Sequence, residues 1–385
     1  MKAMYLSGAP RLSTKASTES LGPRSHILGV IRGFEQHGVE IDRFIVGDAM
    51  PDAVHGQGSE GRMSSGVLPL LAADVFRFAS RLRSRLQLKM RARNRSLDFV
   101  YERYALFQEL GSVARRETGA LWILEVNALL AVEATSERRA TTSRRLAEWM
   151  EKRTLRRADV IVAVTQALAD QLGSHYGIPA ERMLVVANGV DHTVHHAAVP
   201  ITLASTPRIG FLGTLYPWQN VSSLVALLSA EGLLAAELHI AGDGPERAAL
   251  EQQARALGVE GRVHFRGRVH PDEVPEFLAG VDLCFAGHSS ANGSYFSPLK
   301  LWEYLAAGKP VVASRHEVTA DLESQGFAVV CYDPSGADDL KSVLTRSVAS
   351  LADLSRRAAD KQRDVWAEHS WGRRVETILD SVRVP

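Results

Sequence analysis

Short apolar runs alternate with segments of helical periodicity along almost the whole chain. In the first half we expect strands at 3–7, 39–46, 97–101, 120–126 and 158–164, and helices at 26–36, 106–118 and 166–176. The alternation begins again with expected strands at 208–213, 237–241, 263–266, 283–286, 310–313 and 328–332, and helices at 221–228, 248–257, 272–278 and 299–307. Strands that alternate with helices in this way predict parallel sheets with helices on both faces.

The stretch 177–207 separates the two alternating halves. It contains Pro179 and the turn pair Asn188-Gly189. We therefore predict an α/β chain with two Rossmann-like domains, 1–200 and 201–365, followed by a terminal helix, 366–385, that crosses back to the first domain. Strand carboxyl ends and helix N-termini meet in a cleft between two such sheets, so we expect the ligand there.

Charge and cysteine content exclude several classes of protein. Lys and Arg total 45 and Asp and Glu total 44, a balance that argues against a nucleic-acid-binding protein. The two cysteines, Cys284 and Cys331, exclude a disulfide framework and a cysteine-rich zinc site. No apolar run approaches the roughly 18 residues of a membrane span, and Pro10 and Arg11 come too early for a signal peptide. We expect a cytoplasmic setting.

One segment, 77–95, departs from the even charge balance, because it holds eight basic residues and no acidic one. Phe76, Leu82, Leu86 and Met90 fall on one helical stripe in and beside it. Two interpretations are open: a solvated helix packed on the first domain, or a basic amphipathic surface for weak contact with anionic lipid at the inner membrane face or with an anionic acceptor.

The block Ser297-Pro298-Leu299-Lys300-Leu301-Trp302-Glu303 opens a helix that we expect to end at Gly308. Ser297 fits the N-cap position and Pro298 the first helical position. Free backbone N–H groups at such a terminus favour an anion, and Lys300 adds a full positive charge. Glu303, one turn on, can accept hydrogen bonds from a sugar hydroxyl. The alternative is an ordinary capped helix with Lys300 in solvent.

This block resembles the nucleotide-binding signature of family 4 retaining glycosyltransferases of the GT-B fold. Glu303 matches the second glutamate of that signature, which holds the ribose; Tyr295 stands at the first, and the Ser-Pro-x-Lys form looks like a bacterial variant. Further segments resemble family motifs in the right order: 186–191, 208–221, 239–245, 263–269 and the terminal segment with Trp366, Trp371 and Val375.

The resemblance implies a set of site residues. The family's Arg and Lys diphosphate ligands fall at Thr214 and Gln219, so we expect Lys300 to supply the missing charge. Asn127 stands where the family often has a histidine, and Gly22 lies in a stretch that resembles its glycine loop. The expected donor-binding residues are Gly22, Gly213, Thr214, Gln219, Arg268, Val269, Ser297, Pro298, Leu299, Lys300 and Glu303. The expected catalytic residues are Lys300, Asn127, Glu102 and Arg103, and those on the acceptor side are Arg24 and His26.

For Glu102 and Arg103 the alternative is a structural ion pair or solvated charges. The implied reaction is retaining, front-face transfer from a nucleoside diphosphate sugar, most simply UDP-linked, to a small-molecule or lipid-linked acceptor, with no cofactor and no metal. We interpret His192, His195 and His196 as linker polarity. Two alternatives keep the fold: a sugar-nucleotide 2-epimerase, and a catalytically silent protein that binds a nucleotide or glycan.

Overall fold

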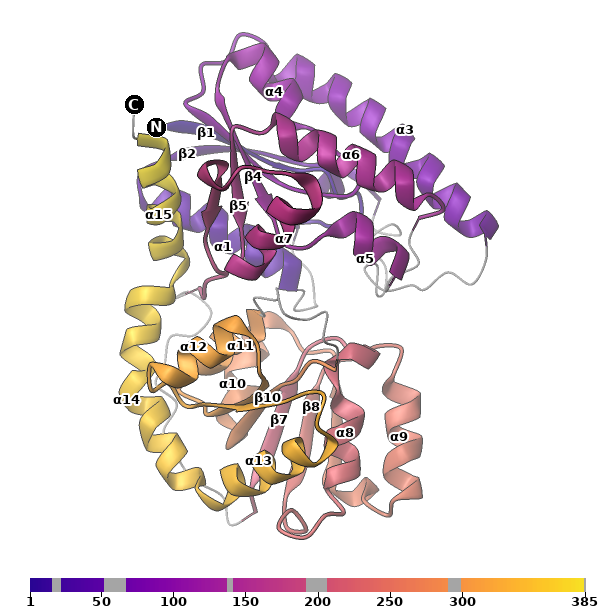
Figure 1. Ribbon diagram of the computed structural model, residues 1–385, viewed down its shortest axis with the longest axis vertical. Helices are drawn as coiled ribbons and strands as arrows, with labels where there is room; N and C mark the ends of the chain where they lie inside the picture. The colour runs from indigo at the N-terminus through magenta and orange to yellow at the C-terminus, as the bar shows by residue number, and fades with distance from the viewer. Residues whose placement is uncertain (16–21, 52–66, 137–140, 192–205, 290–298, 384–385) are drawn as a thin grey trace. The chain divides into compact units, whose positions relative to one another are not determined.

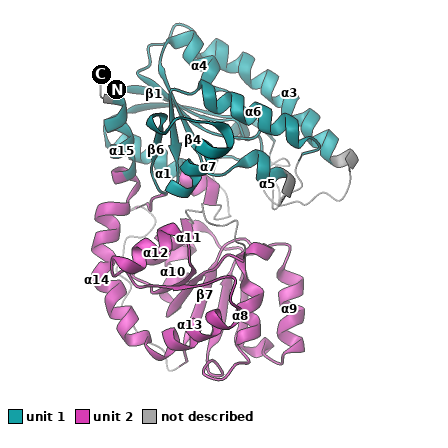
Figure 2. Cartoon of the chain, viewed as in Figure 1, with its two compact units in different colours: residues 1–15, 27–187, 374–385 teal, residues 16–26, 188–373 magenta. Residues whose placement is uncertain are grey.

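The chain divides into two compact units, coloured separately in Figure 2. Unit 1 comprises residues 1–15, 27–187 and 374–385, and unit 2 comprises residues 16–26 and 188–373. The computed structural model describes residues 1–15, 22–51, 67–136, 141–191, 206–289 and 299–383. Some residues named in the sequence analysis lie outside these ranges: His192, His195, His196, Tyr295, Ser297 and Pro298.

Unit 1 is built on a six-stranded parallel sheet with the strand order β2-β1-β3-β4-β5-β6 (Figure 1). Its core packs Met4, Leu6, Val100 and Leu110 against Leu88 of a long helix. The elements are β1 (Lys2–Ser7), α1 (Gly22–Gln36), β2 (Glu40–Ile45), η1 (Val46–Ala49), α3 (Val67–Ala92), β3 (Phe99–Arg103), α4 (Gly111–Thr118), β4 (Leu121–Val126), α5 (Leu130–Ser136), α6 (Arg144–Arg157), β5 (Val160–Ala163), α7 (Gln166–Tyr176), η2 (Ala180–Arg182) and β6 (Met183–Val185).

Unit 2 contains a second six-stranded parallel sheet, with the order β12-β11-β10-β7-β8-β9. Its first elements are β7 (Arg208–Leu212), η3 (Pro217–Gln219), α8 (Val221–Leu227), β8 (Glu237–Ala241), α9 (Arg247–Ala256), η4 (Glu260–Arg262), β9 (Val263–Gly267), η5 (Pro271–Glu273), α10 (Val274–Ala279) and β10 (Leu283–Ala286). They are followed by α11 (Leu299–Ala306), β11 (Val311–Ser314), α12 (Glu317–Ser324), β12 (Val329–Tyr332), α13 (Ala337–Ala349) and α14 (Leu351–His369). The last helix, α15 (Trp371–Arg383), begins in unit 2 and belongs to unit 1 from residue 374 on.

These two sheets confirm the predicted fold class of two Rossmann-like α/β domains. Strands 237–241 and 283–286 and helix 166–176 have the expected bounds. Local chemistry accounts for the ends of the helix, because Thr165 Oγ1 accepts a hydrogen bond from the Leu168 amide at 3.1 Å, and Gly177 follows the helix with φ 66°. Gly308, with φ 67°, lies just beyond the end of α11.

The helix expected at 106–118 is shorter than predicted. It begins at Gly111, because Phe107 adopts φ 65°, a left-handed conformation that a helix does not continue through. The carboxylate of Glu102 then accepts hydrogen bonds from the amides of Leu110 and Gly111, both at 2.8 Å, and so satisfies the free N–H groups where α4 begins.

The basic segment 77–95 lies mostly on α3. Most of its basic side chains turn toward acidic partners: Arg77 to Asp74, Arg81 and Arg85 to Glu109, Arg91 and Arg95 to Asp42, and Lys89 to Glu117. The expected apolar stripe is exposed, with Leu82 64%, Leu86 57% and Met90 72% exposed, as the interpretation of an amphipathic surface requires. The packed face of α3 runs through Leu88 and Ala92, which are fully buried.

None of the helices in the described part of the chain combines the length and the apolar composition that crossing a bilayer requires.

Candidate functional site

In the sheet of unit 2, the order in which successive strands are added reverses between β7 and β10. The chain adds β8 and β9 on one side of β7, and then adds β10, β11 and β12 on the other side. Loops that leave the carboxyl ends of two such strands diverge to opposite faces of the sheet, and the space between them is the usual ligand site of an open α/β sheet. The residues that follow β7 and β10 are therefore the first candidates.

Lys300, in the first turn of α11, contacts the loop that follows β7. Its Nζ donates a hydrogen bond to Gln219 Oε1 at 2.6 Å and stands 4.0 Å from the centre of the Phe211 ring. A Cβ on Gly213 would lie only 3.1 Å from the same Nζ. The structure thus brings together three residues expected in the donor site, Gly213, Gln219 and Lys300, although more than 80 residues separate Gln219 from Lys300 along the chain.

Glycines let the loops at this edge of the sheet pack backbone against backbone. Gly242, directly after β8, has φ 155°, and a Cβ there would lie 1.9 Å from the Gly213 carbonyl oxygen. A Cβ on Gly244 would lie 2.6 Å from the Leu215 amide nitrogen. The Gly242 amide donates to the Gly267 carbonyl at 2.7 Å, which ties the loop after β8 to the end of β9. No side chain fits at Gly242 or Gly244, because the neighbouring backbone fills the space that a Cβ would need.

The charged side chains at this site, Lys300 and Glu303, are half-buried. Burial lowers the pKa of Lys300 to about 7, and only the nearby Glu303 carboxylate acts in the opposite direction. Burial likewise raises the pKa of Glu303 to about 7, against the attraction of Lys300. The hydrogen bond from Lys300 goes to a neutral amide oxygen, and no ion pair joins its ammonium to a carboxylate of the described residues. An ammonium group placed in this way favours an anionic ligand.

The helix that carries Lys300 and Glu303 is fixed to the sheet. Tyr304 is fully buried, and its hydroxyl accepts a hydrogen bond from the Leu212 amide of β7 at 2.8 Å. Leu301, Trp302 and Leu305 are buried beside it. Because α11 is anchored one residue after Glu303, the positions of both charged side chains relative to β7 are set by packing.

Gly22, expected to contact the diphosphate, is grouped with unit 2 and lies at the start of α1. A Cβ on Gly22 would stand 3.3 Å from Leu299 Cδ1, so this glycine lies against the first residue of α11. Arg24 follows in the first turn of α1 and is half-buried. His26 is buried, and its ring packs edge-on against Trp371 at 4.7 Å between centres.

A second polar cluster lies in unit 1, around the carboxylate of Glu125 at the end of β4. This carboxylate accepts hydrogen bonds from Tyr101 at 2.7 Å, from Arg103 at 3.2 Å and from the side-chain amide of Asn127. Arg103 and Glu125 are register partners on neighbouring strands, which places their side chains on one face of the sheet. The cluster brings together two of the expected catalytic residues, Arg103 and Asn127.

Both halves of the chain match known glycosyltransferase families. Residues 22–194 match the profile described as Glycosyltransferase Family 4, and residues 206–347 match the profile described as Glycosyl transferases group 1. Together the two matches take in most of the chain. The chain is a glycosyltransferase with a family 4 domain and a group 1 domain.

Individual relatives are distant in sequence but similar in fold. A D-inositol 3-phosphate glycosyltransferase of Rhodococcus opacus is 27% identical over 307 residues, which cover 74% of this chain and 67% of that protein. Sucrose-phosphate synthase of Thermosynechococcus elongatus superposes with a TM-score of 0.73 at 16% identity, covering 99% of this chain and 98% of that one. HepE of Anabaena, solved with UDP and glucose, gives 0.67 at 18% identity and covers 100% and 99%. These structures establish the GT-B fold.

Within this glycosyltransferase the expected site residues fall into three groups. Gly22, Gly213, Gln219, Leu299, Lys300 and Glu303 gather around the start of α11. Thr214 follows Gly213 in the β7 loop, and Arg268 and Val269 follow β9, with Arg268 exposed and Val269 buried. Arg103 and Asn127 surround Glu125 in unit 1.

Two residues have positions that argue for structural roles. Glu102 has no exposed surface, and both of its carboxylate oxygens accept hydrogen bonds from the amides at the start of α4. We therefore assign it to helix capping rather than to catalysis. The ion pair considered as the alternative for Arg103 is formed with Glu125, not with Glu102. His26 is buried against Trp371, so we assign it to packing rather than to acceptor contact.

Sequence reasoning passed over two histidines at the same edge of the unit 2 sheet. His288 follows β10 and His316 follows β11, each two residues beyond the strand. Burial lowers the pKa of His316 to about 4, and His288 acts in the same direction, so the two imidazoles lie near each other and His316 is neutral at pH 7. The sequence held a signal for this pair, because each histidine follows a strand by two residues and the two strands are neighbours in the sheet.

Proposed function

We propose that this glycosyltransferase moves a sugar from a nucleoside diphosphate donor, UDP-linked, to an acceptor hydroxyl with retention at the anomeric carbon. The observation that carries the proposal is the partly buried Lys300 ammonium, which meets a neutral amide oxygen, an aromatic ring and the backbone at Gly213. A diphosphate bound there would give Lys300 an anionic partner in direct contact.

The proposed chemistry needs little from the protein beyond charge and position. The bond between the anomeric carbon and the diphosphate oxygen breaks, and the acceptor oxygen bonds to that carbon on the same face. The acceptor proton passes to the leaving diphosphate oxygen, so no strong protein base is required. Lys300 and the backbone amides at the start of α11 stabilise the charge that develops on the diphosphate. Glu303 accepts hydrogen bonds from the ribose hydroxyls.

Similar proteins support the donor and leave a range of acceptors. HepE was solved with UDP and glucose, and the relative from Rhodococcus is named for an inositol phosphate acceptor. We propose a UDP-sugar as donor and a small-molecule or lipid-linked hydroxyl compound as acceptor. No cofactor or metal takes part in the proposed transfer.

The test compares UDP-, dTDP- and GDP-sugars by thermal shift and then by turnover. We expect UDP and its sugars to stabilise the chain, and Lys300→Ala to lower kcat about a hundredfold, the usual loss when one charged contact to a transition state is removed. Lys361→Ala is the matched control, because Lys361 also stands over an aromatic ring of unit 2, 5.2 Å from Phe327. Wild-type turnover in Lys300→Ala would contradict the role of Lys300.

The same assay separates the alternative functions. Release of an epimerised UDP-sugar without acceptor would identify a 2-epimerase. Tight UDP binding with neither hydrolysis nor transfer would identify a silent binding protein. For a transferase, nuclear magnetic resonance of the product gives the anomeric configuration, and an inverted product would contradict front-face transfer.

We further propose a weak contact between α3 and an anionic membrane surface. Exposed apolar residues recur along one face of the helix at helical spacing, Leu71, Val75, Leu82, Leu86 and Met90, each at least half exposed. Since most of the basic side chains already pair with acidic partners, insertion of the apolar face contributes more than net charge.

Flotation with vesicles tests this contact. We expect the chain to float with vesicles of anionic lipid at low salt, and Leu82→Ser with Leu86→Ser to reduce the bound fraction severalfold. Arg83→Gln changes one charge on the same helix and serves as the control for a purely electrostatic contact. An absence of wild-type binding to anionic vesicles at low salt would remove the membrane proposal and leave the transferase proposal intact.

A further inference from the structure

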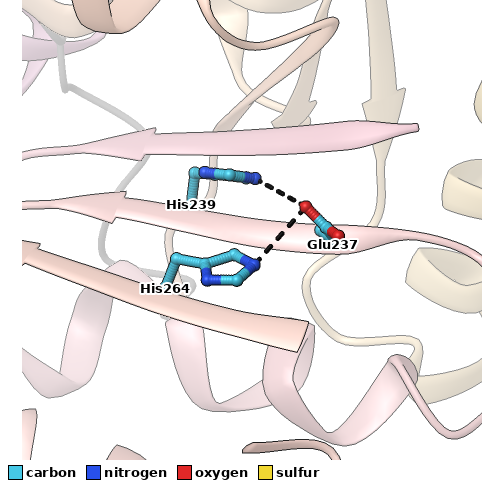
Figure 3. Close-up of side chains that lie close together, drawn as sticks. All are labelled: Glu237, His239 and His264. Carbon is cyan, nitrogen blue, oxygen red and sulfur yellow. Dashed lines mark hydrogen bonds and ion pairs between the residues drawn. The ribbon is translucent and has the colours of Figure 1, made fainter. Parts of the chain in front are cut away.

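Three side chains with metal-binding atoms meet on the sheet of unit 2. Glu237 and His239 lie on β8, and His264 lies on the neighbouring edge strand β9 (Figure 3). Glu237 and His239 are two residues apart, so they share one face of the sheet. His264 is the register partner of His239. The intervening Leu238 points to the opposite face, where it is part of the hydrophobic core.

The distances within this cluster suit a tetrahedral ion. Glu237 Oε2 lies 3.1 Å from His239 Nε2 and 3.4 Å from His264 Nε2, and the three donor atoms all lie within 4.8 Å of one another. Ligands about 2.0–2.1 Å from a tetrahedral zinc ion stand roughly 3.3–3.4 Å apart. Two imidazoles and one carboxylate also form a donor set that zinc proteins use.

One nitrogen of the cluster has no hydrogen bond. His264 Nε2 is buried and makes no hydrogen bond with the described residues, its contact with Glu237 being an ion-pair distance of 3.4 Å, although the whole side chain is 42% exposed. Arg208 on β7 is the register partner of Glu237, and its guanidinium donates two hydrogen bonds to the Asp282 carboxylate, both at 2.9 Å.

We propose that Glu237, His239 and His264 bind a Zn²⁺ ion that clamps the edge strand β9 to β8. Glu237 is 32% exposed, so water can supply the fourth ligand. The cluster lies where β8 and β9 begin, whereas Gly242 and the donor-site loops follow their carboxyl ends, roughly 13 Å away along β8. The ion is therefore structural, and the proposed sugar transfer does not pass through it.

Zinc titration of the full chain without an affinity tag tests the proposal. Because the chain also carries His192, His195 and His196, all titrations use a background in which these three are replaced by alanine. We expect one equivalent of Zn²⁺ to bind and to raise the melting temperature by several degrees, since a ligand that binds only the folded state stabilises it. Co²⁺ in place of Zn²⁺ should give the visible absorption of a tetrahedral ion.

Variants identify the ligands. His239→Ala, His264→Ala and Glu237→Gln should each weaken Zn²⁺ binding at least tenfold and abolish the thermal shift. His175→Ala is the matched control, because His175 is equally exposed at 42% and stands 3.8 Å from a single carboxylate, that of Glu148. Its zinc affinity should equal that of the background chain.

Other outcomes overturn the proposal. Equal zinc affinity in the three variants would place the ion elsewhere, and no binding up to about 1 mM would show that the cluster is an ordinary hydrogen-bonded group. Should an alanine variant fail to fold, removal of zinc from the background chain by a chelator still decides, because the melting temperature must fall and return when Zn²⁺ is restored.

Discussion

The half-buried ammonium of Lys300 makes donor binding depend on pH in a defined direction. Burial lowers its pKa to about 7 in the free chain. A bound diphosphate favours the charged form and returns the pKa toward its ordinary value of about 10.4. A group whose pKa rises on binding takes up a proton, so the affinity for UDP must fall as the pH rises above 7.

The size of this effect follows from the two pKa values. At pH 9, two units above the pKa in the free chain, about one lysine in a hundred carries a proton before UDP binds. Protonating it then costs about 2.7 kcal/mol, which corresponds to a hundredfold loss of affinity relative to the fully charged state. Glu303 has a pKa raised to about 7, so its own titration is nearly complete by pH 8. Between pH 8 and 9 the affinity should fall about tenfold.

Isothermal titration calorimetry with UDP measures both quantities. The dissociation constant at pH 8 and pH 9 gives the slope, and titration in two buffers of different ionisation enthalpy gives the proton uptake, which should be nearly one proton at pH 8. Lys300→Arg is the control, because a guanidinium stays charged throughout this range and removes the slope. A flat affinity and no proton uptake in the wild type would refute the reasoning from burial.

Three further changes test the structure of the site and of the elements that hold it. Tyr304→Phe leaves a buried β7 amide without its acceptor and should lower the free energy of unfolding in urea by about 1–3 kcal/mol. Tyr104→Phe is the control: the buried Tyr104 hydroxyl has no hydrogen-bond partner in the described ranges, so its loss should change that free energy by less than about 0.5 kcal/mol. Glu102→Gln, measured at pH 8, leaves one α4 amide facing an NH₂ group and should cost about 1–3 kcal/mol; unchanged stability would contradict the capping role. Gln219→Lys should restore much of the UDP affinity lost in Lys300→Met, because the two side chains meet at 2.6 Å. Calorimetry of the double variant measures this recovery. An unchanged low affinity would show that UDP does not bind where these two side chains meet.

The fold could be predicted where no polar residue interrupts the pattern of buried apolar residues. Strands 237–241 and 283–286 are short apolar runs bounded by turns or polar residues, and their bounds follow from that pattern. Helix α6 was not expected, because its buried stripe includes Glu151 and Thr154 among the apolar residues, so its periodicity is weak in sequence. The orientation of α3 could not be predicted either, because Glu109, far along the chain, draws arginines inward.

The site could be predicted in its local part only. The start of α11 is a continuous stretch of sequence, so Lys300 and Glu303 follow from it directly. The partner of Lys300 does not, since Gln219 reaches it only through the order of β7 and β10 in the sheet. The Glu237, His239 and His264 cluster likewise depends on the register between β8 and β9, which the sequence pattern leaves open.

Both charged clusters of unit 2 show why the even charge balance of the chain says little about its ligands. Total Lys and Arg exceed total Asp and Glu by one, yet Lys300 has a neutral amide as its hydrogen-bond partner, and His239 and His264 converge on one carboxylate. Loss of water works against the charged form of the Lys300 ammonium and lowers its pKa to about 7. A lysine in this state regains its proton when an anion binds. The two proposals therefore assign an anionic diphosphate to one edge of the sheet and a metal cation to the opposite edge, a pairing that the net charge of the chain does not reveal.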